Sequence, residues 1–95
     1  MSFGVISSWT SSAPMSEELK SEARNKYAPG VKALGASQVH FIQTSDSTFQ
    51  VVTIYPDEGV ANSARDKQAA LHAQAAGELP VKMVGEYRGE VFAAA

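Results

Sequence analysis

The apolar residues of the chain fall into short stretches that are rich in β-branched and aromatic residues. Residues 3–9 (FGVISSW) are followed by the polar cluster TSSAP, which predicts a first strand that ends in a loop. Residues 39–56 (VHFIQTSDSTFQVVTIYP) predict two strands that flank a polar turn. Residues 80–95 (PVKMVGEYRGEVFAAA) are also extended in character, but Gly85 and Gly89 interrupt them. We therefore expect a central hairpin and a last strand that is bent, bulged or split in two.

The segment between the first strand and the hairpin shows helical spacing. Ser16 precedes two glutamates, as an N-cap residue does, and Leu19, Ala23 and Tyr27 follow at four-residue intervals. A Pro-Gly pair shortly after Tyr27 breaks or kinks this helix. The residues VKALGA that come next predict one further short helical turn, which ends at Gly35.

A second, longer helix is predicted after the hairpin, from about Glu58 to Ala76. Asp57 is its expected N-cap, and Gly77 is its expected terminator. The sequence AALHAQAA makes this helix rich in alanine, which gives it a high intrinsic helix propensity. Because alanine is small, the helix can lie close to a sheet.

The predicted order of elements is therefore strand, helix, strand, strand, helix, strand. This βαββαβ order is the ferredoxin-like arrangement of the α+β class, in which two helices cover one face of a four-stranded antiparallel sheet. At 95 residues the chain has the length of one domain, so we expect a single domain over residues 1–95.

The hairpin indicates that both faces of this sheet are apolar. If residues 45–47 form the turn, Phe41 lies across from Val51 on one face, and His40 lies across from Val52 on the other. The first face then carries Val39, Phe41, Phe49, Val51 and Tyr55, and the second carries Ile42, Val52 and Ile54. Two helices can cover only one of these faces, so we predict a homodimer through the open sheet face. The alternative is a monomer whose half-exposed apolar sheet binds a ligand or a partner.

The segment PGVKALGASQVHFIQTSDSTFQVVTIYPD resembles the dimeric α+β barrel superfamily, which includes antibiotic-biosynthesis-type monooxygenases and small stress-responsive barrel proteins. In it a helix ends in ALGA, a hairpin follows, and a YPD step leads into the second helix. The resemblance covers nearly the whole chain in element order. It implies that two sheets close into a barrel at the dimer interface, and that a cleft between each sheet and its helices can hold a ligand. It does not imply one chemistry, because the superfamily contains oxygenases, isomerases and haem enzymes.

Three aromatic residues are candidates for the lining of such a cleft. Trp9, Tyr27 and Tyr55 combine an apolar ring with a polar tip, as small-molecule pockets require, but each also suits a core. The resemblance adds that cofactor-free monooxygenases hold phenolic substrates with aromatic and polar groups. Asn62 and Arg65 on the second helix are possible polar partners, although a solvated helix face explains both equally simply.

The chain has two histidines, and both are candidates for the pocket. We interpret His40 as a hydrogen-bonded structural residue of the core or the dimer interface. His72 lies on the second helix, where haem-degrading relatives place the histidine that binds iron. Those relatives also use an asparagine on the first strand and a tryptophan beyond that strand. This chain has no asparagine on its first strand, and its tryptophan, Trp9, lies at the end of the strand. We therefore do not expect haem oxygenation, and we interpret His72 as a surface residue of the helix.

Composition and charge exclude several functions. The net charge is only -2 and lysine and arginine do not cluster, which argues against binding to nucleic acid or to an anionic membrane. The absence of cysteine excludes disulfides, thiolate nucleophiles and cysteine-based zinc sites. Two distant histidines, without a repeated carboxylate spacing or a glycine-rich phosphate loop, predict neither a metal site nor a cofactor. No stretch has the length of a membrane span, and we expect a cytoplasmic protein.

Three functions remain open at this point. The first is a cofactor-independent monooxygenase or isomerase that acts on a small aromatic or lactone-like molecule, with Trp9, Tyr27 and His72 lining the cleft. The second is a dimer that binds a small apolar ligand without turnover. The third is a structural dimer whose cleft is filled by its own side chains. The first two predict a cavity of the size of small-molecule sites, and the third predicts a closed interface.

Overall fold

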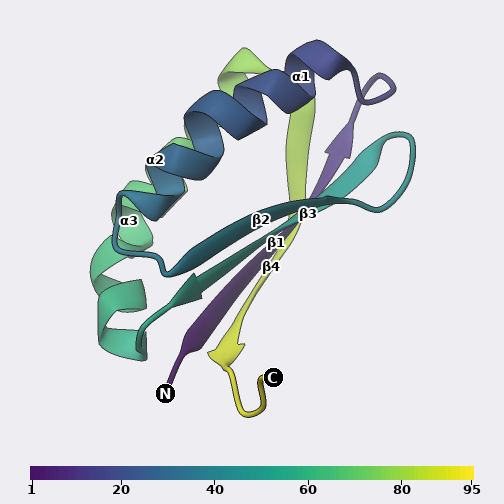
Figure 1. Cartoon of the computed structure of the whole chain (residues 1–95). Coiled ribbons are helices and arrows are strands. Elements are labelled where there is room, and N and C mark those ends of the chain that lie inside the picture. Colours follow the sequence, from purple (N-terminus) through teal and green to yellow (C-terminus); the bar gives the residue numbers. More distant parts are fainter.

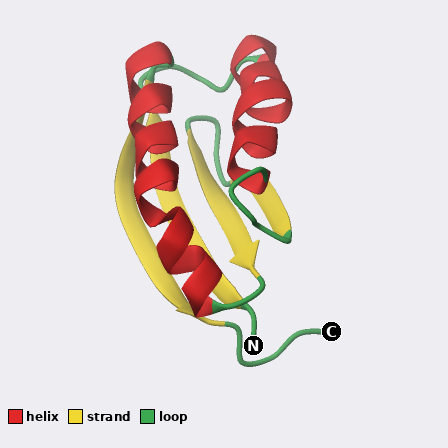
Figure 2. Ribbon diagram, turned by 90° about the vertical axis from the view of Figure 1, so that its left-hand side faces the viewer, coloured by secondary structure: helices red, strands yellow, loops and turns green.

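The computed structural model describes all residues from 1 to 95 and contains one four-stranded antiparallel sheet (Figure 1). In chain order the elements are β1 (Phe3–Ser11), α1 (Glu17–Glu22), the π-helical η1 (Ala23–Tyr27), α2 (Ala28–Lys32), β2 (Gln38–Gln43), β3 (Thr48–Tyr55), α3 (Glu58–Glu78) and β4 (Val81–Glu90). The strands lie in the order β2-β3-β1-β4. All helices pack on one face of the sheet (Figure 2). The predicted βαββαβ ferredoxin-like arrangement is therefore confirmed.

The first helical segment continues across its proline instead of breaking there. The hydroxyl of Ser16 accepts a hydrogen bond from the Leu19 amide at 3.1 Å, as its role as N-cap requires. The π-helical turn of η1 ends two residues before Pro29, whose ring would clash with the carbonyl of the preceding turn in a regular α-helix. The wider π turn makes room for this ring. Gly35, with φ of 109°, ends the segment in the left-handed region.

The hairpin has the register that its sequence predicts. His40 pairs with Val52 and Phe41 pairs with Val51, so residues 45–47 form the turn. In β1 and β3 every second side chain is buried under the helices, which gives each strand an inner and an open face. β4 is a single bulged strand, because its register against β1 shifts between Ser8 and Trp9. This irregularity agrees with the expectation of a bent or bulged last strand.

The long helix α3 begins at its predicted cap but does not end at Gly77. The Asp57 carboxylate accepts a hydrogen bond from the Val60 amide at 2.8 Å. At the other end the helix runs through Gly77 to Glu78. A glycine in a helix costs about 1 kcal/mol relative to alanine. Contacts of Glu78 with the first helical segment, and packing of Leu79 against the core, hold this last turn.

The core between helices and sheet has two apolar clusters. One contains Phe3, Val5, Ala36, Tyr55, Ala61 and Ala64, and the other contains Trp9, Leu19, Phe49, Val51 and Val81. A buried polar side chain of α3, Gln68, contacts the sheet through two hydrogen bonds. It accepts one from the Tyr55 hydroxyl at 2.9 Å and donates one to the Thr53 hydroxyl at 3.3 Å. The second cluster surrounds the cavities described next.

Candidate functional site

An inner cavity of about 30 Å³ lies between the first helical segment, α3 and the sheet. Twelve of its thirteen lining residues are hydrophobic, and the remaining one is His72. Trp9, Tyr27 and Phe49 contribute aromatic walls, and α3 contributes Leu71 next to the histidine. A volume of this size holds about one water molecule, so the side chains nearly fill the inner cavity.

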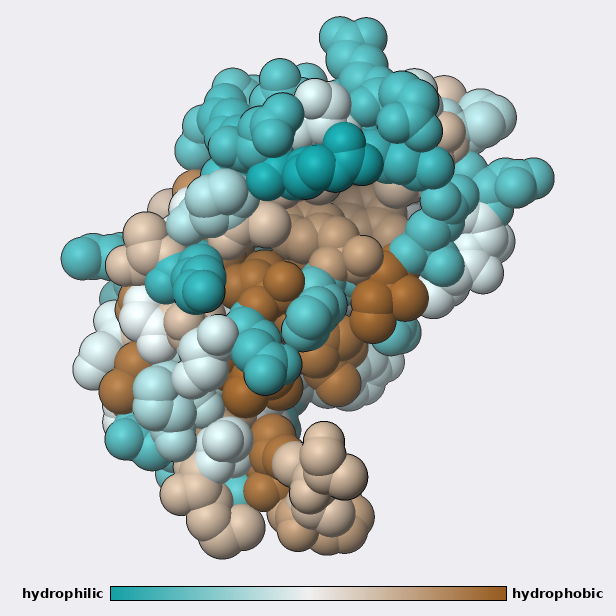
Figure 3. All heavy atoms as spheres, in the orientation of Figure 1, coloured by the Kyte–Doolittle hydropathy of each residue, from teal (hydrophilic) through white to brown (hydrophobic).

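An outer groove of about 430 Å³ lies between α1–η1 and the edge strand β2. The outer groove and the inner cavity share Leu19, Ala23, Phe41 and Phe49 in their walls, so the two spaces adjoin. In the space-filling view an apolar hollow lies beneath a hydrophilic band (Figure 3). The polar residues that line the outer groove are Lys20, Arg24, His40 and Gln43. Its volume is within the range of small-molecule sites.

Trp9 forms a rigid wall of the inner cavity. Its ring stacks on Phe49 with 5.9 Å between the ring centroids, and it meets the His72 ring edge-on at 5.4 Å. The indole N–H donates to the Ser7 hydroxyl at 2.8 Å, two residues earlier on the same strand. Because this polar atom is already bonded within β1, Trp9 offers the cavity its apolar ring.

His72 is the polar group of the inner cavity, and the interpretation of it as a surface residue is wrong. Only 11% of its side chain is exposed, and neither ring nitrogen has a hydrogen-bond partner within the protein. Its closest charged neighbour is Glu86, with 3.9 Å between Nδ1 and the carboxylate, which is too long for a hydrogen bond. Burial lowers the pKa of His72, and the charge of Glu86 offsets this only in part. The imidazole is therefore neutral near pH 7, with one free donor and one free acceptor.

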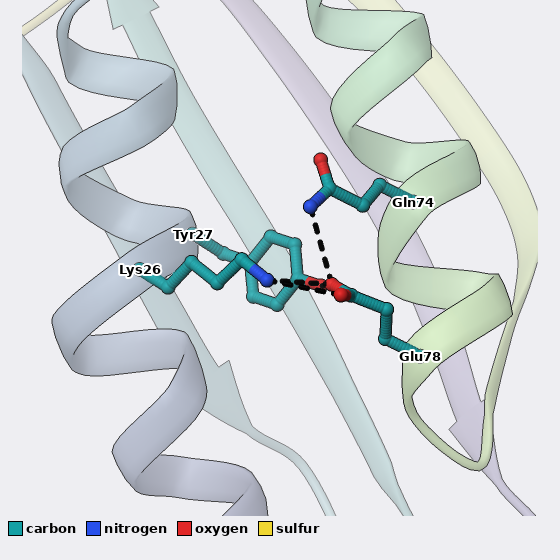
Figure 4. Close-up of polar contacts among 4 residues, drawn as sticks. All are labelled: Lys26, Tyr27, Gln74 and Glu78. Carbon is teal, nitrogen blue, oxygen red and sulfur yellow. Dashed lines mark hydrogen bonds and ion pairs between the residues drawn. The ribbon is translucent and has the colours of Figure 1, made fainter.

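Tyr27 lines the inner cavity with its ring, while its hydroxyl is bonded to α3 (Figure 4). The hydroxyl donates to the Glu78 carboxylate, which also accepts from Lys26 Nζ at 2.7 Å and from Gln74 at 3.2 Å. Burial, and then the hydrogen bond to Glu78, raise the pKa of Tyr27 to about 12. Tyr27 therefore supplies an apolar wall, and its hydroxyl ties the first helical segment to the last turn of α3.

Tyr55 lies in the other core cluster and lines neither the inner cavity nor the outer groove. It is fully buried, and its hydroxyl donates to Gln68. Desolvation by burial raises its pKa, and Arg88 opposes this effect, so the hydroxyl stays protonated near neutral pH. The two polar candidates on α3 also lie outside both spaces. Asn62 accepts a hydrogen bond from Arg88 at 3.4 Å, and Arg65 is exposed.

His40 is exposed on the open face of the sheet, so its interpretation as a core residue is wrong. Its Nε2 lies 3.2 Å from the Gln38 side-chain oxygen, and the residue borders the outer groove. The reason is that His40 pairs with Val52 on the face that no helix covers, in a strand at the edge of the sheet. The role of His40 in a dimer interface stays a prediction.

Sequence reasoning missed the basic residues of the outer groove. Lys20 and Arg24 each follow an inward-facing residue of the first helical segment, Leu19 and Ala23. That four-residue spacing places both basic side chains on one side of the helix. The signal was therefore present in the sequence next to the apolar pattern.

A solved structure with the same fold is a protein from Bacillus halodurans that belongs to the ethyl tert-butyl ether degradation (EthD) family. The TM-score is 0.65, the sequence identity is 14%, and the match covers 97% of this chain and 100% of the other. The chain thus shares the α+β ferredoxin-like fold of this protein, as its sequence predicts. No protein-family model matches the sequence. No curated protein is significantly similar to it in sequence.

The chain has neither a membrane-spanning helix nor a cluster of metal-binding side chains. None of its helices combines the length and the apolar character that crossing a membrane requires. No group of three or more histidine, aspartate and glutamate side chains is placed to hold a metal ion.

Proposed function

We propose that the protein binds a small, largely apolar molecule in the outer groove, and that a polar group of this ligand reaches His72 through the inner cavity. This proposal rests on His72, because both of its ring nitrogens lie in an apolar cavity without a hydrogen-bond partner in the protein. A buried polar group without a partner costs about 1 to 3 kcal/mol, so native proteins seldom keep one. A ligand hydroxyl or carbonyl would supply the missing hydrogen bond.

We further propose that His72 acts as a general base in this site. A neutral imidazole can accept a proton, and its lowered pKa keeps it neutral at physiological pH. An isomerase of a lactone-like molecule needs such a base to move a proton between two carbons. A cofactor-independent monooxygenase needs one to convert a phenol into the electron-rich anion that reacts with O₂. Both reactions suit an aromatic or lactone-like ligand in an apolar groove.

The small volume of the inner cavity favours a second candidate function, which is ligand binding without turnover. The inner cavity has a volume of about 30 Å³, so only one small group of a ligand can reach His72. The body of the ligand lies in the outer groove. Turnover separates the two functions. If the protein consumes the ligand, and the His72→Gln substitution slows this consumption, the result supports catalysis. If the ligand binds and is not consumed, the result supports the second candidate.

The first test is binding of neutral aromatic probes. We expect 1-naphthol and coumarin to bind the full-length protein in isothermal titration calorimetry. Ala23 lines both the inner cavity and the outer groove, so Ala23→Phe should fill the shared space and weaken binding at least about tenfold. The control Ala70→Phe adds the same ring to an exposed position of α3 and should bind like the wild type. Absence of binding, or equal binding by Ala23→Phe, would contradict the proposal.

We also propose that the protein is a homodimer through the open face of the sheet. This face carries exposed apolar side chains on both of its edge strands, with Ile42 48% exposed and Tyr87 64% exposed. Val52 and Ile54 lie between them on β3. A second copy offers a surface of the same shape and chemistry, and a twofold axis would bury both faces at once.

Light scattering at micromolar concentration should therefore give the mass of two chains. The double substitution Ile42→Asp with Tyr87→Asp puts a charge on each side of the open face and should give the mass of one chain, because burying unpaired carboxylates is costly. Ala70→Asp places the same charge on an exposed position of α3 and should leave the dimer intact. A wild-type protein that is monomeric under these conditions would refute the dimer.

A further inference from the structure

The two ends of the proposed site differ in charge. The inner cavity is apolar apart from His72, whereas the outer groove has Lys20 and Arg24 on its helical side. No aspartate or glutamate lines the outer groove. In a chain whose net charge is -2, a groove with only positive charges does not follow from composition.

The two basic side chains are available to a ligand. Lys20 has its nearest carboxylate at 3.9 Å, on the largely exposed Glu17, and the Arg24 side chain makes no hydrogen bond or ion pair. The opposite wall has no lysine, arginine or carboxylate, and its polar side chains already have partners. The Gln43 amide donates to the Ser45 carbonyl at 2.9 Å, and the His40 ring contacts Gln38. An anionic group in the outer groove would therefore lie on the side of α1–η1.

We propose that the ligand is an amphiphilic anion, with an apolar or aromatic body and one small acidic group such as a carboxylate. This inference rests on the proposed function and names the ligand class of the same site. The acidic group lies beside Lys20 and Arg24 at the mouth, where water still solvates it. The apolar body lies on Phe41 and Phe49, which line both spaces, and a neutral hydroxyl or carbonyl at the far end faces His72. The reverse orientation would bury the charge in the apolar inner cavity, which is costly.

The expected preference for an acid over its neutral analogue is modest, because Lys20 and Arg24 are accessible to water. Exposed ion pairs contribute little, so two of them should favour an acid over its neutral analogue by about tenfold at low salt. Screening should reduce this preference as the ionic strength rises. Binding of the neutral analogue should depend much less on salt.

The experiment compares 6-hydroxy-2-naphthoate with 6-hydroxy-2-naphthamide, which share the ring and the hydroxyl, by calorimetry on the full-length protein. We expect the acid to bind about tenfold more tightly at low salt and to lose most of this preference at about 1 M salt. The double variant Lys20→Gln with Arg24→Gln should bind both probes with the affinity of the amide. The control Lys32→Gln with Arg65→Gln changes two exposed basic residues outside the outer groove and should keep the preference.

The outcomes separate this inference from the proposal on which it rests. Equal binding of acid and amide, with no salt dependence in the wild-type protein, overturns the anionic ligand class and leaves the binding site standing. A preference that survives in the Lys20→Gln, Arg24→Gln variant also overturns it. If neither probe binds, and 1-naphthol and coumarin do not bind either, the proposed function fails and the inference fails with it.

Discussion

Replacing Gln68 with alanine is expected to lower the free energy of unfolding by about 3 kcal/mol. Gln68 is only 2% exposed, and its amide bonds to the hydroxyls of Tyr55 and Thr53 under α3. The substitution leaves a cavity, and it leaves two buried hydroxyls without their partner. Loss of a large buried side chain costs about 2 to 5 kcal/mol, and an unsatisfied buried polar group costs about 1 to 3 kcal/mol before the structure relaxes. Urea denaturation at one fixed protein concentration measures the change.

Two control variants separate this effect from a change in helix propensity. Gln74→Ala removes an exposed glutamine from the same helix and should change stability by less than about 0.5 kcal/mol. Tyr55→Phe removes one hydrogen bond and should cost about 1 kcal/mol. In the double variant with Gln68→Ala the losses should be less than additive, because both substitutions remove the same contact. Equal losses for Gln68→Ala and Gln74→Ala would contradict the buried polar network.

The hairpin shows why much of the fold is readable from the sequence. Strand side chains alternate between faces, so a turn of three residues is enough to determine which residues pair and which face each one occupies. The inner positions Phe49 and Val51 and the open position Val52 follow from that rule alone. The end of α3 does not follow from the local sequence. Gly77 predicts that the helix ends there, but a contact with a residue far away in the chain extends the helix past it. Glu78 is bonded to Lys26, which lies 52 residues earlier in the chain.

The site was harder to predict than the fold for a related reason. Trp9 and Tyr27 are identifiable as candidate wall residues, because each has an aromatic ring with a polar tip at an inward-facing position of its strand or helix. The sequence does not show that His72 faces the sheet, since alanine occurs on both the buried and the exposed side of α3. Ala64 is buried while Ala69 and Ala70 are exposed. An alanine-rich helix thus has no strong apolar stripe to indicate which side faces the sheet.

The substitution His72→Leu is expected to stabilise the protein and to weaken ligand binding at the same time. Leucine fills a similar space in the apolar cavity and removes two buried nitrogens that have no partner. The expected gain is about 1 to 2 kcal/mol at pH 7.5. Affinity for 1-naphthol should fall, because the proposed hydrogen bond to the ligand is lost. A residue that lowers stability and raises affinity is typical of a functional position.

The pH dependence gives this prediction a second, independent test. Burial lowers the pKa of His72 in the folded chain, so below about pH 6.5 the unfolded chain takes up a proton that the folded chain does not. The contribution of His72 to stability is therefore complete above that pH and is lost as the pH falls toward the lower folded pKa. The stability difference between His72→Leu and the wild type should widen from pH 7.5 to pH 5. His72→Gln, which is polar but does not titrate, should show the same widening without the gain at pH 7.5. A constant difference, or a leucine variant less stable than the wild type, would show that His72 is well accommodated without a ligand.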